Sequence, residues 1–258
     1  MNEKTFDDAG KRVFFLYPHS VIEDKIVSVI IRGEFEVYLV YDKAKTVSLM
    51  KKFPGSILFI NIDRELQEED WEKYITSIRN SEGTADTQIG ILSYNEDKDL
   101  SKKYLMDIGI QCGFVRLKLG VEESSKILLK TLIATEARGK RKYVRARCDK
   151  LSNVSFNIQN GGGRYTGSII DISVAGMACT FSNSAHYSPG DRIKDIQLVL
   201  KGKRVSVSGI LAGKRDTDGS DLYVIMFTEP ISGESKDKIH DFIHLALQEN
   251  ISRLMNVL

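Results

Sequence analysis

The spacing of hydrophobic residues changes a little past the midpoint of this 258-residue chain. Before residue 138, short runs of strand-forming residues alternate with segments whose apolar residues recur every three or four positions, as on one face of a helix. After it, short strand-like segments follow one another with turn signals between them. Two such patterns predict two domains, and the chain is long enough for each domain to bury its own core.

Residues 1–137 are predicted to form an α/β domain. Five apolar segments expected as strands alternate with five amphipathic segments expected as helices. This alternation indicates a five-stranded, doubly wound parallel sheet with helices on both faces. The predicted strands are 12–17, 35–41, 56–62, 88–93 and 112–117, and the predicted helices are 20–31, 43–52, 68–77, 99–106 and 122–137.

Residues 151–258 are predicted to form an antiparallel β-barrel of six or seven strands with a terminal helix. Short strands separated by turn signals such as Asn160-Gly-Gly-Gly163 and Pro189-Gly190 are typical of small barrels. The terminal helix is expected over 235–252, with an apolar face that covers one mouth or edge of the barrel. The predicted strands are 155–158, 164–172, 177–181, 196–200, 203–211 and 222–227.

Residues 138–150 are predicted to be a linker arm, and the segment from Arg138 to Arg147 holds six cations in ten residues. Residues 1–137 contain 19 lysines and arginines against 23 acids, whereas residues 138–258 contain 18 against 12. We call the segment from Arg138 to Arg147 the basic arm. Its six positive charges equal the whole net charge of residues 138–258. Because the net charge of the chain is only +2, we expect the arm to meet one focused anionic ligand and not to coat a nucleic acid.

Several classes of protein are not indicated by the sequence. The N-terminus carries acids where a secretory signal has a basic region, and no apolar run is long enough to span a bilayer, so we expect a cytoplasmic protein. Three widely spaced cysteines fit neither a disulfide framework nor a zinc site. His240 and His244 have the spacing of two zinc ligands on a helix, but no third ligand is near in sequence, so we interpret it as coincidence. No catalytic signature is present, and we expect no enzyme, metal or cofactor.

The predicted α/β domain resembles response-regulator receiver domains. In that family an Asp ends the third strand, Ser or Thr follows the fourth and Lys ends the fifth, and Asp63 (or Asn61), Ser93 and Lys118 fall near those places. The acidic pair that the family carries after the first strand is replaced by Tyr17-Pro-His-Ser20. Without that pair a magnesium ion lacks oxygen ligands. We therefore expect a degenerate receiver that is not phosphorylated, serves as an interaction module and uses Asp63 as a capping or turn carboxylate.

Two short motifs stand in order in the second half. Arg141-Lys-Tyr-Val-Arg145 has the pattern RxxxR, and Asp171-Ile-Ser-Val-Ala-Gly176 has the pattern DxSxxG on a predicted strand-to-strand turn. Either motif alone is common, but their order and spacing within a barrel pattern are specific. Together they resemble the PilZ domain, the bacterial receptor module for cyclic di-GMP, over roughly residues 138–250. The resemblance implies a second-messenger receptor in signal transduction.

The arm supplies the cations that this ligand needs. Guanine N7 and O6 accept two parallel hydrogen bonds from one guanidinium, which also stacks on bases and binds phosphate. Arg141 and Arg145 are therefore expected to close over the nucleotide from one side. Lys140 and Arg147 flank them and are candidate phosphate contacts, while the remaining two cations of the arm are expected to be solvated.

The barrel is expected to supply shape and polarity from the other side. Asp171 can accept hydrogen bonds from guanine N–H groups, and Ser173 can bond a phosphate or a base edge. Gly176 permits a backbone turn that a Cβ would obstruct. These three residues complete the predicted cyclic di-GMP site.

The sequence therefore predicts a cyclic di-GMP effector. Binding at the joint between the domains is expected to change their arrangement or to control an unidentified protein partner of the N-terminal domain. A different interpretation makes the chain a nucleic-acid-binding adaptor that uses the basic arm, with or without gating by cyclic di-GMP.

Overall fold

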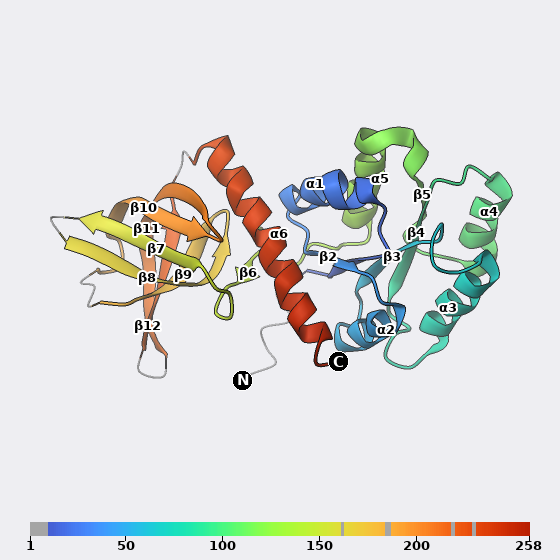
Figure 1. Ribbon diagram of the computed structural model, residues 1–258, viewed down its shortest axis with the longest axis horizontal. Coiled ribbons are helices and arrows are strands. Elements are labelled where there is room, and N and C mark those ends of the chain that lie inside the picture. The colour runs from blue at the N-terminus through green and yellow to red at the C-terminus, as the bar shows by residue number, and fades with distance from the viewer. Residues whose placement is uncertain (1–9, 161–162, 184–186, 218–219, 229–230) are drawn as a thin grey trace. The chain divides into compact units, whose positions relative to one another are not determined.

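The computed structural model describes residues 10–160, 163–183, 187–217, 220–228 and 231–258. The chain divides into two compact units, and Figure 1 colours it by residue number from blue at the N-terminus to red at the C-terminus. One consists of Met1–Lys142 with Ile251–Leu258, and the other of Tyr143–Asn250. The division falls inside the basic arm, so Arg141 belongs to the first unit and Arg145 to the second.

The first unit is built on a parallel sheet with the strand order β2-β1-β3-β4-β5. Every pairing in it is parallel, and this is the order of flavodoxin-like doubly wound sheets. The strands β1, β2 and β3 are buried along their whole length, as expected where helices cover both faces. The predicted α/β fold is confirmed. The strands are β1 Val13–Leu16, β2 Val37–Val40, β3 Ile57–Asn61, β4 Gln88–Ser93 and β5 Phe114–Arg116.

Helices connect these strands and lie on both faces of the sheet. In Figure 1, α1 and α5 lie on one face, and α2 and α3 on the other. Asp42 begins α2 by accepting hydrogen bonds from the backbone N–H groups of Ala44 and Lys45 at 2.9 and 3.0 Å. Gly109, with φ of 69°, ends the helical segment before β5. The helical segments are 22–26 with α1 Val27–Arg32, α2 Lys43–Lys52, α3 Glu68–Asn80, α4 Lys98–Lys102 with 103–108, 117–119 and α5 Gly120–Ala134.

The second unit is a closed antiparallel barrel. Its strand order is β6-β8-β7-β10-β11-β12-β9, and a further pairing of β8 with β9 closes six of the strands into a ring. The short strand β6 stays outside the ring, on the edge of β8. The predicted barrel of six or seven strands is confirmed. The strands are β6 Ala146–Arg147, β7 Val154–Asn160, β8 Gly163–Ser173, β9 Gly176–Phe181, β10 Arg192–Leu200, β11 Lys203–Thr217 and β12 Ser220–Phe227.

The strand β8 organises this barrel because it pairs with three others. One of its edges pairs first with β7 and then, at Asp171 and Ile172, with β6. Its other edge pairs with β9, with a shift of register between Ile169 and Asp171. Such a bulge re-aims the side chains that follow it, and here Asp171 is the first residue after it.

The terminal helix α6 spans Gly233–Met255, and its residues up to Asn250 belong to the second unit. Ile239, Phe242 and Ile243 on one face of it are buried. Lys203 forms an ion pair with Asp241 at 3.3 Å, and the neighbouring Lys201 pairs with another acid of α6, Glu249. These contacts fix α6 to the turn between β10 and β11.

Three findings concern the residues that the structure describes. No helix in the described ranges is long and apolar enough to cross a membrane. No group of three or more His, Cys, Asp or Glu side chains in those ranges has the arrangement of a metal site. The cysteines Cys112, Cys148 and Cys179 are all buried and unpaired, as expected of small core residues.

Candidate functional site

The DxSxxG motif forms the tight turn between β8 and β9. Ser173 ends β8 and is only 3% exposed. Its Oγ accepts a hydrogen bond from the backbone N–H of Ala175 and donates one to the carbonyl of Gly176, both at 3.3 Å. The hydroxyl that was expected to meet a ligand is therefore engaged in holding the turn.

Gly176 is required by a close approach between strands. It begins β9 and pairs with Met226 of β12. A Cβ at this position would lie 2.4 Å from the carbonyl oxygen of Ile225, well inside the normal contact distance. The expected obstruction thus lies against the neighbouring strand and not within the turn.

Asp171 points outward from the barrel beside the arm. Its strand neighbour Ile172 is fully buried, whereas the Asp171 side chain is 30% exposed. The guanidinium Nη1 of Arg145 lies 3.8 Å from Asp171 Oδ1. Burial, together with the nearby charge of Asp171, raises the pKa of both Cys148 and Cys179 to about 12, so these thiols stay neutral beneath the site.

Residues 144–148, where the basic arm joins the barrel, are alternately buried and exposed. Val144, Ala146 and Cys148 are buried, while Arg145 and Arg147 are exposed. The backbone N–H of Cys148 donates to the carbonyl of Ile170 at 2.7 Å. Because buried and exposed positions alternate, Arg145 and Arg147 stand on the same outward side.

Arg147 lies directly opposite Asp171 in the β6–β8 pairing. Its guanidinium contacts Asp149 through Nε and Nη2 at 3.3 and 3.4 Å. Its carbonyl accepts a hydrogen bond from Asn250 Nδ2 of α6 at 2.9 Å. The second unit therefore brings Arg145, Arg147 and Asp171 together, and the sequence did not mark Asn250 as the partner of the Arg147 carbonyl.

The other cations of the arm belong to the first unit. Lys140 and Arg141 are exposed. Arg138 is also exposed, and its guanidinium lies 5.0 Å from the centre of the Phe35 ring while its Nη2 donates to the carbonyl of Gly33 at 2.9 Å. Arg138 is thus exposed, as expected, but it also makes a structural contact within the first unit.

Asp63 joins three loops at the carboxyl edge of the parallel sheet. Its Oδ1 accepts from Ser93 Oγ at 2.5 Å, and its Oδ2 accepts from the backbone N–H of Tyr94 at 2.7 Å. His19 Nε2 lies 3.0 Å from the same Oδ2. Lys118, by contrast, pairs with Glu96 at 2.7 Å. Asp63 is thus a loop-joining carboxylate and not a helix cap.

The partnership of His19 with Asp63 was missed in the sequence. Both residues follow neighbouring parallel strands, β1 and β3, whose carboxyl ends meet at one edge, and this shared edge was the available signal. Ser93 hydrogen-bonds to the aspartate and not to the histidine. The three side chains therefore lack the serine–histidine contact of a nucleophilic triad.

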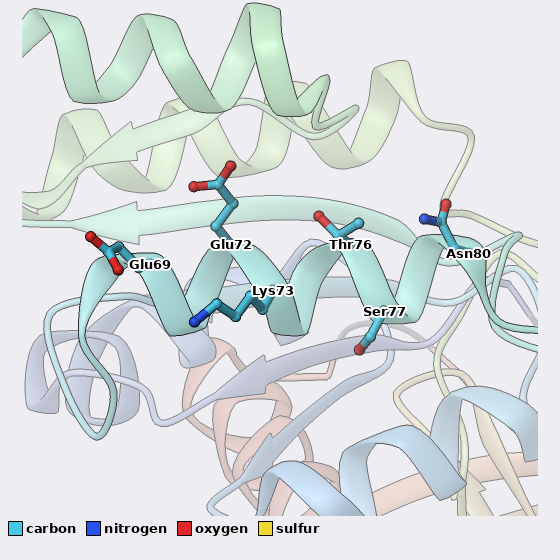
Figure 2. Close-up of a pocket in the computed structure, with 6 residues that line it drawn as sticks. All are labelled: Glu69, Glu72, Lys73, Thr76, Ser77 and Asn80. Atoms are coloured by element: carbon cyan, nitrogen blue, oxygen red, sulfur yellow. The ribbon is translucent and has the colours of Figure 1, made fainter.

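A shallow groove on α3 offers no alternative site. It is lined by Glu69, Glu72, Lys73, Thr76, Ser77 and Asn80. Figure 2 shows that all six come from one helix and point in different directions. Since binding sites bring polar groups together from several elements, this groove has no feature of one.

The fold and contacts define a small β-barrel module with a cationic arm beside an acid-bearing turn. Residues 139–245 match the family model of the PilZ domain, and this part of the chain is a PilZ domain. No curated protein matches the chain.

Among solved structures, the chain is similar to the PilZ domain of YcgR from Escherichia coli with c-di-GMP, with 14% identity, a TM-score of 0.39, and coverage of 46% of this chain and 99% of that one. It is similar to the K. pneumonia MrkH–c-di-GMP complex, with 19% identity, a TM-score of 0.36, and coverage of 45% and 56%. It is also similar to a signal receiver domain of a histidine kinase from Clostridium thermocellum, with 15% identity, a TM-score of 0.39, and coverage of 48% and 97%.

Replacing Gly176 by Ala should destabilise the second unit. The added Cβ would meet the Ile225 carbonyl at 2.4 Å, and overpacking of this kind costs about 1–3 kcal/mol. Urea unfolding followed by circular dichroism measures the change. Gly213→Ala is the matched control, because a Cβ there has no neighbouring atom within 4 Å. Equal stability of the two variants would contradict the close approach.

The first unit should not accept a phosphoryl group on Asp63. Both carboxylate oxygens already accept hydrogen bonds, and no group of acids or histidines suited to a metal ion occurs in the described parts of the chain. Incubation with acetyl phosphate and magnesium, followed by intact mass spectrometry, should show no gain in mass. A gain that disappears in Asp63→Asn would overturn this expectation.

Proposed function

We propose that the protein is a receptor for cyclic di-GMP that binds the nucleotide without turnover. The observation that carries the proposal is the meeting of the two motifs on one edge of a PilZ domain, where Arg145 lies 3.8 Å from Asp171. A ligand with two phosphates and two guanines needs cations beside hydrogen-bond acceptors, and the β6–β8 edge has both.

Each site residue has a proposed role. Arg141 and Arg145 grip guanine edges and phosphates, and Asp171 accepts from guanine N–H groups. Lys140 and Arg147 add phosphate contacts. Ser173 and Gly176 act through the turn, because the serine hydroxyl holds it and the glycine lets β12 approach.

Binding must separate Arg145 from Asp171. Their side chains are 50% and 30% exposed, and exposed ion pairs contribute about 0–1 kcal/mol. A nucleotide that offers both a phosphate and a guanine N–H edge can replace this pair with charge-assisted hydrogen bonds to each partner, worth about 1.5–3 kcal/mol apiece. The Arg145–Asp171 pair therefore keeps the residues in place without closing the site.

The proposed signal is a change in the freedom of the arm. Arg141 belongs to the first compact unit and Arg145 to the second, so a ligand gripped by both would restrict the chain that joins the units. Such an ordering can change the domain arrangement or expose a surface for a protein partner. Small-angle scattering with and without the nucleotide tests this step separately from binding.

Loss of either motif arginine should abolish or strongly weaken binding. In isothermal titration calorimetry, Arg141→Ala and Arg145→Ala should each raise the Kd for cyclic di-GMP by at least about 10- to 100-fold, because each removes charge-assisted hydrogen bonds. Arg138→Ala removes the same charge from the same arm, but its partners are Phe35 and Gly33, so its Kd should stay within about 3-fold of wild type.

Circular dichroism of each variant checks that the fold is intact. Wild-type affinity in both Arg141→Ala and Arg145→Ala would refute the assigned site. No measurable binding by the wild-type protein would refute the proposed function itself.

Nucleic acid is the second candidate ligand, because the arm holds six cations in ten residues. The second unit itself is nearly neutral, since residues 143–250 hold 13 basic and 12 acidic residues, so the barrel adds almost no positive charge to that of the arm. We therefore expect duplex DNA and single-stranded RNA to bind weakly in gel shifts at physiological salt. A complex that survives there, with log K falling steeply against log salt, would favour the adaptor, and repeating the assay with cyclic di-GMP would reveal gating.

A further inference from the structure

The peptide group that joins Arg147 to Cys148 is held from two sides. Its N–H, on Cys148, donates to the carbonyl of Ile170 in β8 at 2.7 Å. Its carbonyl, on Arg147, accepts from Asn250 Nδ2 of α6 at 2.9 Å. The strand β6 has only two residues and lies outside the ring of the barrel. The bond from Asn250 is therefore one of the few backbone-directed bonds that fix the end of the basic arm.

Whether Asn250 reaches the arm depends on the position of α6. The preceding residue, Glu249, forms an ion pair with Lys201, and Ile243 and Ala246 of the same helix are buried. Hydrogen bonds lose most of their strength when the two heavy atoms are more than about 3.5 Å apart. A shift of α6 by about 1 Å would therefore break the bond from Asn250 to the arm.

The helix continues past Asn250 into the first unit. Figure 1 shows α6 as one unbroken helix, and residues 251–258 belong to the first unit. Within that unit Ile251 is buried, and the carbonyl of Met255 accepts from Lys45 Nζ of α2 at 2.8 Å. A cation at the last carbonyls of a helix is favourable, because it also meets the negative end of the helix dipole. Five residues of helix, about 7.5 Å, thus separate the bond that holds the arm from the bond that holds the helix end.

We infer that α6 is a regulatory element of the nucleotide site, in which Asn250 is a positioning residue of the arm and Lys45 holds the end of the helix. This inference rests on the proposed function. While Lys45 holds the last turn, α6 keeps Asn250 within reach of the arm, so the arm is ordered before the nucleotide arrives. Release of the last turn lets α6 shift and frees the arm, and the nucleotide then binds more weakly because it has to order the arm itself. Since such coupling is reciprocal, bound nucleotide strengthens the attachment of the last turn by the same factor.

Hydrogen exchange tests the anchor without any nucleotide. Asn250→Leu keeps the size of the side chain but removes its donor, so the Cys148 amide should exchange at least about 10-fold faster than in the wild type, measured by NMR on the full chain. Asn250→Asp also lacks the donor but stays polar, and it should behave in the same way. Leu245→Ala is the control on the same helix, since Leu245 is 49% exposed, and it should leave the rate unchanged. An unchanged Cys148 rate in both Asn250 variants would overturn the inference.

Affinity for cyclic di-GMP, measured by isothermal titration calorimetry, tests the coupling. Asn250→Leu should raise the Kd by about 5- to 10-fold, because it removes one hydrogen bond that orders the arm. Lys45→Met keeps the aliphatic stem and lies outside the proposed site, yet it should raise the Kd by about 3-fold or more through α6. Lys43→Met is the matched control, because it removes the same charge from an exposed position of the same helix, and its Kd should equal that of the wild type.

The double variant separates an effect through α6 from a general loss of stability. Once Asn250 no longer holds the arm, Lys45→Met should not raise the Kd further, because two residues that act through one element are not additive. Equal rises in the two backgrounds, or an unchanged Kd in Lys45→Met, would refute the role of α6. A wild-type chain that binds no cyclic di-GMP refutes the proposed function instead, and the Cys148 exchange rate then still shows whether Asn250 holds the arm.

Discussion

The backbone pairing of β8 is the interaction on which the second unit depends. One edge of β8 pairs with β7 and then with β6, and the other edge pairs with β9 to close the barrel. The strand that closes the barrel by pairing with β9 therefore also fixes Arg147 of the arm by pairing with β6. Because the register at Asp171 is set from both edges, the fold itself brings its carboxylate beside Arg147 of β6, without any side-chain contact having to select that arrangement.

The features that depend on local sequence were predictable. The bounds of α2 and β4 agree with the prediction because an Asp cap and a continuous apolar run leave few alternatives. The strand β6 was not predicted, since two residues carry no periodic signal and their pairing with β8 is long-range. The contact of His19 with Asp63 was missed for the same reason, because 44 residues separate two side chains that only the parallel sheet brings together. Gly176 was recognised as necessary, but its neighbour in space, Ile225, could not be foreseen without the barrel register.

The carboxylates of Asp63 in the first unit and Asp171 in the second differ in their surroundings. In the first, Asp63 accepts hydrogen bonds from a serine, a backbone N–H and the neighbouring His19 ring, and its side chain is 24% exposed. Its oxygens are committed to joining three loops, which gives them a structural use. In the second, the Asp171 side chain is 30% exposed, and the guanidinium of Arg145 lies 3.8 Å from it. The greater exposure of this carboxylate is the reason that the proposed site is assigned to the barrel and not to the parallel sheet.

The weakness of the Arg145–Asp171 contact is what suits it to a receptor. A strong buried pair would cost several kcal/mol to separate, and a ligand would have to supply that energy before any gain in affinity. An exposed pair worth about 0–1 kcal/mol imposes almost no such cost, yet it biases the arginine toward the acid and so reduces the conformational entropy lost on binding. Anchoring of the Arg147 carbonyl by Asn250 acts in the same direction. Under the proposed function, most of the binding energy then remains for ordering the part of the arm that precedes Arg145, which is the segment that joins the two units.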